Sequence, residues 1–124
     1  MTSPLHAESL LSALARAYDG EGRAGVDQAI PLLQQAIRIE PDNAYAWREL
    51  AQARDMRGEE ALAQLASAEQ NFSLGDYNAA LSFAERARRT LPQNTVDYQR
   101  ASDIVNFAGD HVADQMRRQG GGRS

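Results

Sequence analysis

The chain has 124 residues and a mass of 13.6 kDa, which suits one domain and leaves too few residues for a second hydrophobic core. Its formal net charge is −4 at pH 7, so we expect no nucleic-acid partner, because phosphate binding needs a basic face. The absence of cysteine excludes disulfides and thiolate metal sites. No stretch approaches the roughly 18 apolar residues of a membrane span, and the first residues show no signal-peptide pattern.

The composition indicates helices. Alanine, the strongest helix former, occurs 22 times, whereas valine, isoleucine and threonine, which favour strands, together occur 11 times. Apolar residues recur at helical spacing in six segments that short breakers separate. The sequence therefore predicts an all-α protein of about six helices.

The first two helices are predicted over residues 4–18 and 26–39. Ser3 is expected to cap the first helix, and Pro31 is expected near the first turn of the second helix, where its missing N–H costs little. The apolar face predicted for the second helix consists of Ala29, Ile30, Leu33, Ala36 and Ile37.

Turns rich in proline or glycine separate the other four helices, which are predicted over 44–57, 59–74, 77–90 and 95–118. The inward residues predicted for these helices are, in chain order, Trp47, Leu50, Ala51 and Arg54; Ala61, Leu65, Ala68 and Phe72; Tyr77, Ala80, Ala84, Ala87 and Leu91; and Ala101, Ile104, Val105, Ala108, Val112 and Met116. Because the connections are short, neighbouring helices should lie antiparallel. We expect one helical domain over 1–118 and a flexible tail over 119–124.

These helix pairs resemble the tetratricopeptide repeat (TPR), a helix–turn–helix unit of 34 residues. The repeat's W-x2-L-small signature begins at Trp47, and residues 75–92 resemble the second helix of a unit. The resemblance implies antiparallel hairpins stacked as a short superhelix. Pro41 and Pro92 are 51 residues apart, which is one and a half repeats, so the helix over 59–74 fits either the end of one repeat or the start of the next.

A narrower resemblance covers about residues 8–105. The strings PDNAYAWRELA at 41–51, LGDY at 74–77, AERA at 84–87 and RASDI at 100–104 are similar to the C-terminal repeat region of bacterial M48-type zinc metalloproteases of the β-barrel assembly-enhancing kind. Members of that family carry a secretion signal, a peptidase domain with an H-E-x-x-H motif and a repeat domain of this type. The resemblance implies that this chain is the substrate- or partner-docking domain of an envelope enzyme, with a periplasmic location.

The chain itself lacks catalytic motifs. Its two histidines, His6 and His111, are 105 residues apart, and neither belongs to an H-E-x-x-H motif. Asp110, His111 and Asp114 bring three potential metal ligands near one turn, but we interpret His111 as a surface or half-buried histidine. No phosphate-binding glycine loop or nucleophile elbow is present. We therefore expect no catalytic residues, metal or cofactor in this chain alone.

Binding residues are expected on the surface that the first helix of each hairpin lines. The candidates are Tyr45, Arg48, Gln52 and Asp55 on the third helix, and Ser9, Ser12 and Arg16 on the first. Their hydrogen-bonding groups and mixed charge suit a protein or peptide segment. The TPR family's clamp for chaperone C-terminal carboxylates uses lysine and asparagine, and this chain, which has no lysine, departs from that pattern.

Three functions follow from the sequence. The first is a protein–protein interaction module, namely the docking domain of an envelope M48-type metalloprotease. The second is a free-standing TPR adaptor or scaffold in the cytoplasm, for which self-association into a homo-oligomer is left open. The third is a non-catalytic fragment that completes a hydrolase active site in trans.

Overall fold

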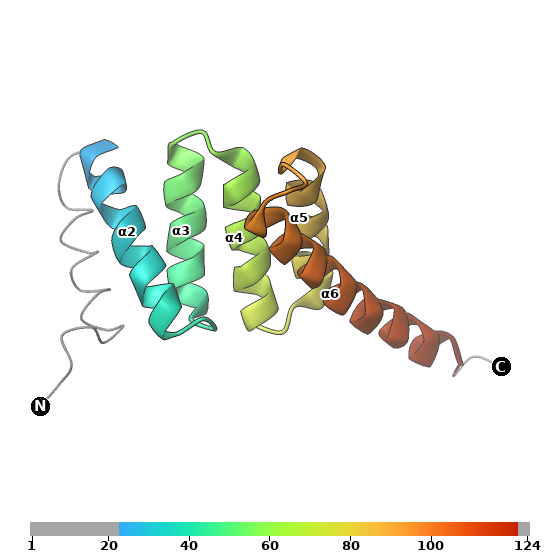
Figure 1. Ribbon diagram of the computed structural model, residues 1–124. Coiled ribbons are helices and arrows are strands. Elements are labelled where there is room, and N and C mark those ends of the chain that lie inside the picture. Colours follow the sequence, from blue (N-terminus) through green and yellow to red (C-terminus); the bar gives the residue numbers. More distant parts are fainter. Residues whose placement is uncertain (1–22, 122–124) are drawn as a thin grey trace, which may run out of the picture.

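The computed structural model describes residues 23–121, and every regular element in this part of the chain is an α-helix. The helices are α2 (Arg23–Ile39), α3 (Ala44–Met56), α4 (Glu60–Ser73), α5 (Tyr77–Thr90) and α6 (Val96–Gly121). Helices α2 to α5 stand side by side in alternating directions, and α6 crosses over and extends away from them (Figure 1). The all-α class is confirmed, whereas the helix predicted over 4–18 lies outside the described residues.

Local side-chain contacts explain where two of the helices begin. The Asn43 carboxamide oxygen accepts a hydrogen bond from the Ala46 N–H at the start of α3, at 3.1 Å. The Asp76 carboxylate does the same for Ala79 at the start of α5, also at 3.1 Å. Each cap satisfies an N–H group that has no partner within its helix, so the predicted starts of α3 and α5 are confirmed.

Helix α2 differs from its prediction at its first half. It begins at Arg23, three residues before the predicted start, so that Pro31 lies in the helix interior rather than near its first turn. A proline there removes one helical hydrogen bond. The exposed side of the helix tolerates this loss, because Pro31 faces solvent while Val26 and Leu33 bury the opposite side. Burial of residues before and after Pro31 in the chain, such as Val26 and Leu33, therefore outweighs the preference of proline for a helix start.

The core consists of two clusters. The first joins α2 and α3 to one side of α4, with Ile30, Leu33 and Leu50 among its members. The second joins the other side of α4 to α5 and α6. Its alanines are completely buried, with exposed fractions of 0% for Ala68, Ala80, Ala84, Ala87, Ala101 and Ala108. These small side chains let the helix axes approach closely, as the alanine stripe of α5 predicted.

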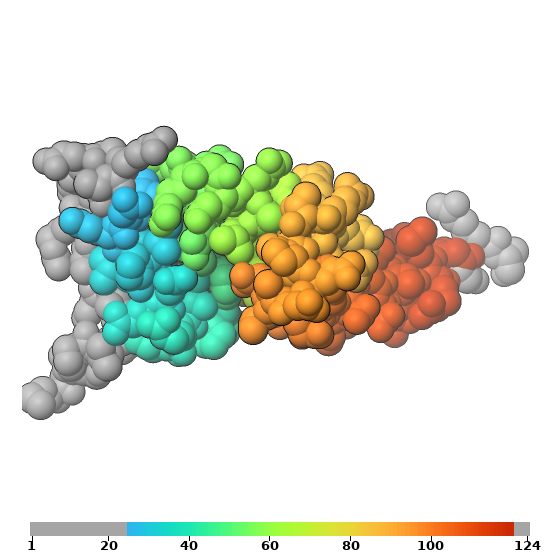
Figure 2. All heavy atoms as spheres, turned by 45° about the horizontal axis from the view of Figure 1, so that its top comes forward, coloured from blue at the N-terminus to red at the C-terminus, as the bar shows by residue number. Residues whose placement is uncertain are grey.

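No helix within residues 23–121 lies beside the far end of α6. This end projects past α5 in both the ribbon and the space-filling views (Figures 1 and 2). Met116 was predicted to face inward, but its exposed fraction is 66%, because no described element covers this part of the helix. The helix continues to Gly121, beyond the predicted end at 118, and the flexibility expected for 119–124 stays a prediction.

Candidate functional site

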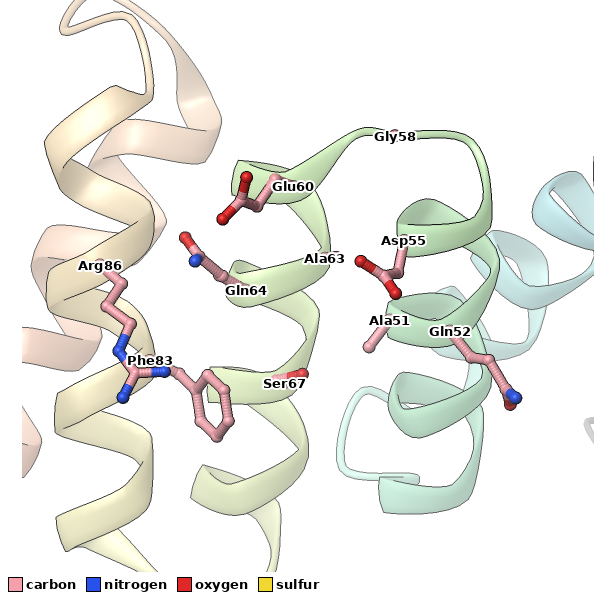
Figure 3. A pocket seen from close by; sticks show the side chains of 10 residues that line it. All are labelled: Ala51, Gln52, Asp55, Gly58, Glu60, Ala63, Gln64, Ser67, Phe83 and Arg86. Carbon is pink, nitrogen blue, oxygen red and sulfur yellow. The ribbon is translucent and has the colours of Figure 1, made fainter.

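A groove of about 470 Å³ runs across α3, α4 and α5 (Figure 3). Its lining residues are Ala51, Gln52, Asp55, Gly58, Glu60, Ala63, Gln64, Ser67, Phe83 and Arg86. We call it the polar groove. The turn at Gly58, whose φ of +76° suits glycine, reverses the chain between α3 and α4 and so brings their polar residues to one face.

Charges of both signs line the polar groove. Asp55 and Glu60 lie on either side of the Gly58 turn, and Arg86 projects from α5 (Figure 3). The Arg86 guanidinium lies 5.3 Å from the centre of the Phe83 ring, within the range of a cation–π contact. None of the three charged side chains forms an ion pair within residues 23–121. Within the described residues, therefore, no ion pair neutralises their charges.

The structure divides the predicted binding residues of α3 into two pairs. Gln52 and Asp55 both line the polar groove, although Gln52 lies at its edge with its side chain directed away from α4 (Figure 3). Tyr45 and Arg48 lie nearer the start of α3 and are not among the lining residues. The Arg48 guanidinium stands 5.4 Å from the centre of the half-exposed Tyr45 ring.

A hydrogen bond to the Glu49 carboxylate, reinforced by the negative charge of that carboxylate, raises the pKa of Tyr45 above the ordinary 10.0.

The predicted binding residues of the first helix, Ser9, Ser12 and Arg16, lie outside the described residues.

Sequence reasoning missed Gln64, Phe83 and Arg86. The alanine stripe of α5 does indicate that Arg86 lies on the outer side of that helix. It does not indicate that Arg86 shares a groove with Asp55, because that depends on how α5 packs against α4.

A second groove, of about 380 Å³, lies between α2, α3, α4 and the start of α6. Its lining residues are Gln34, Ile37, Arg38, Trp47, Leu50, Arg54, Leu62, Leu65, Ala66, Glu69, Val96, Asp97 and Arg100. We call it the apolar groove. The α4 residues that line the two grooves differ by about half a helical turn, so the grooves lie on opposite sides of α4.

His111 belongs to an aromatic cluster rather than to a group of metal ligands. Its ring centre lies 4.4 Å from that of Tyr77 and 4.8 Å from that of Phe107. Within residues 23–121, no three histidine, aspartate or glutamate side chains are arranged to hold a metal ion. The same part of the chain contains no helix with the length and apolar character needed to cross a bilayer.

Comparison of the chain with family models, curated proteins and solved structures found no significant match.

Proposed function

We propose that this chain is a protein-interaction module built from TPR-like helical hairpins, and that it serves as the docking domain of an M48-type envelope metalloprotease. The residues that carry the sequence resemblance support this proposal by their structural roles. Leu50 on α3 is buried in the cluster that joins α2, α3 and one side of α4, and Trp47 packs against the same cluster. Gly75 and Asp76 form the turn and the cap that begin α5.

The packing of α4 against α5 is relevant to whether α4 begins or ends a repeat unit. The short turn at Gly75 joins the two helices, which pack against each other along the alanine stripe of α5. This arrangement favours α4 as the first helix of the unit that ends at Pro92. The alternative, in which α4 closes the unit that begins with Trp47, is also compatible with the contact between α3 and α4.

The observation that carries the proposal is the polar groove. Three helices contribute to it, and Asp55, Glu60 and Arg86 have no ion-pair partner within residues 23–121. Phe83 and two alanines add apolar surface between these charges. A peptide segment offers backbone hydrogen bonds, charged groups and apolar side chains together, so it matches this lining better than a small apolar molecule does.

The first test identifies the partner by site-specific photocrosslinking. A photoreactive amino acid replaces Gln64 within the groove, and Asn106, an exposed residue on α6, serves as the matched control position. We expect a discrete protein to crosslink at Gln64 and not at Asn106. Equal labelling at both positions would argue against the groove as the docking site.

The second test measures binding of the captured segment to two variants. Asp55→Asn with Arg86→Gln removes two of the groove's three charges while keeping polar side chains, and Arg48→Ala with Gln52→Ala shortens the predicted contacts of α3. We expect a loss of about 1–3 kcal/mol for a variant that removes a central contact. Circular-dichroism melts check that both variants fold. Unchanged binding by two correctly folded variants would place the site elsewhere.

The link to a metalloprotease has its own test, which is the DNA sequence around the coding region. We expect a reading frame that encodes a signal peptide and an H-E-x-x-H motif upstream of this repeat region. A gene without them would contradict the metalloprotease assignment. The proposal of an interaction module would then rest on the binding measurements alone.

A further inference from the structure

The charges of the polar groove are ordered across its three helices. Asp55 projects from α3 toward α4, Glu60 lies at the start of α4, and Arg86 projects from α5 (Figure 3). Because these helices stand side by side in chain order, the charge changes from negative to positive across the groove (Figure 1). The partly buried Phe83 ring lies on the α4 side of the Arg86 guanidinium (Figure 3). The groove therefore has an acidic side and a basic side, with an aromatic ring between them.

The arginines nearest to Asp55 in the chain do not neutralise the acidic side. Arg54 pairs with the Glu59 carboxylate at 3.0 Å, and the Arg57 Nε lies 3.8 Å from the same carboxylate. Glu59 itself does not line the groove. Asp55 and Glu60 therefore place two negative charges beside the turn between α3 and α4, and a cationic side chain of a partner is attracted to them.

The basic side extends beyond Arg86. A neighbouring hollow of about 440 Å³ shares Glu60, Gln64 and Arg86 with the polar groove and adds Arg89 and Thr90 to the lining. Arg86 and Arg89 are three residues apart on α5, so they lie on one face of that helix. Both residues are exposed, and neither forms an ion pair within residues 23–121. Their guanidinium groups offer paired N–H donors to carboxylates.

We propose, in an inference that rests on the proposed function, that the polar groove binds a charge-segregated segment of a partner protein. In such a segment an apolar residue separates basic side chains from acidic ones. The basic side chains meet Asp55 and Glu60. The apolar side chain covers Phe83, and the carboxylates meet Arg86 and Arg89. A wholly acidic or wholly basic segment is repelled by one side of the groove while the other attracts it, so the order of charges selects the partner.

Peptides of equal composition test the order of charges. One has two lysines, a leucine and two glutamates in that order between flanking serines, and it is also made with the order reversed, because the groove's charges do not fix the direction of the backbone. The other alternates lysine and glutamate around the same leucine. All are uncharged overall, so attraction to the net charge of the chain is the same for each. By fluorescence anisotropy we expect the tighter of the two segregated peptides to bind at least tenfold more tightly than the alternating one. Equal affinity would overturn the inference.

Two charge reversals locate the interaction. Arg86→Glu changes the basic side of the polar groove, and Arg38→Glu makes the same change on α2, outside this groove, so it is a matched control. Both residues are exposed, and circular-dichroism melts check that both variants fold. We expect Arg86→Glu to weaken binding of the segregated peptide at least tenfold and Arg38→Glu to weaken it less than twofold. Equal effects would overturn the inference, because they would show that the peptide does not occupy the groove.

The segment that crosslinks at Gln64 separates this inference from the proposed function. We expect its sequence to contain a basic and an acidic group of residues with an apolar residue between them. A captured segment without this order would overturn the inference and leave the groove as a docking site. Equal labelling at Gln64 and Asn106 would instead count against the proposed function itself. A second copy of the chain is the competing occupant, and dimerisation in light scattering that Arg86→Glu abolishes would overturn the inference in favour of self-association.

Discussion

Arg100 on α6 binds both carboxylate oxygens of Glu69 on α4, at 2.6 Å from Nε to Oε2 and at 2.6 Å from NH2 to Oε1. The two residues are 31 positions apart, so the pair joins helices that are not consecutive in the chain. Hydrogen bonding to Glu69 raises the pKa of Arg100 above its already high ordinary value. Arg100 therefore stays protonated throughout the physiological pH range.

Removing the arginine of this pair should destabilise the fold. Arg100→Ala leaves the buried Glu69 carboxylate without that partner, and we expect a loss of about 2 kcal/mol in the free energy of unfolding, reduced by the solvent that reaches Arg100. Urea denaturation measures it. The double variant Glu69→Gln with Arg100→Gln carries no buried charge and should lose less than Arg100→Ala. An equal or greater loss in the double variant would contradict this explanation.

A large side chain in the alanine stripe of α5 should be costly. Ala84 has an exposed fraction of 0%, so Ala84→Arg both overpacks the contact with neighbouring helices and buries a charge. We expect a loss on the order of 3 kcal/mol or more. Asn78→Arg adds the same charge at an exposed position of the same helix and serves as the matched control. Similar melting temperatures for the two variants would refute the assignment of Ala84 to the core.

The turn before α5 needs glycine because of its backbone conformation, and not because a larger side chain would lack room. Gly75 has a φ of +78°, and a Cβ added there would meet no atom within 4 Å. Gly75→Ala should therefore cost about 1 kcal/mol through backbone strain alone. Gly75→Asn should cost less, because asparagine tolerates this conformation. A lower melting temperature for Gly75→Asn than for Gly75→Ala would contradict a purely conformational cause.

The ionisation of Tyr45 should depend on Glu49. The hydrogen bond to the carboxylate favours the protonated phenol and raises the pKa of Tyr45 in the folded chain above 10.0. Its stabilising contribution is therefore complete below pH 10 and is lost as the pH rises through the folded pKa. Ultraviolet titration of the chain against Tyr45→Phe isolates this phenol. Glu49→Gln should lower the Tyr45 pKa toward 10, and an unchanged titration would disprove the coupling.

The parts of the fold that sequence patterns predict well depend on residues close together in the chain. Helix α5 has its predicted bounds, because Asp76 caps its start and Pro92 follows its end. The alanines at 80, 84 and 87 then define its buried side with helical spacing. All of this information lies within about 17 residues, so no knowledge of the neighbouring helices is needed.

The parts that the patterns miss depend on distant packing. The pattern starts this helix at 26 with Pro31 near its first turn, whereas α2 begins at Arg23 and Pro31 lies deeper in its interior. The apolar periodicity of α6 continues to Met116, which is exposed because no neighbouring helix among the described elements reaches that far. The two grooves are harder to predict from the sequence than the bounds of the helices. Trp47 and Arg86 are recognisable as apolar and polar surface residues, but their groove partners are set by the packing of three or four helices.

Helix α4 packs against α3, α5 and α6, whereas the other extensive contacts within residues 23–121 join only consecutive helices. Consecutive contacts close short loops, so most of this packing can form rapidly after chain collapse. Either end of the stack can then open while α4 keeps neighbours on its remaining side. Amide protons in the middle of α4 should consequently exchange with solvent more slowly than those of α2 or of the projecting end of α6.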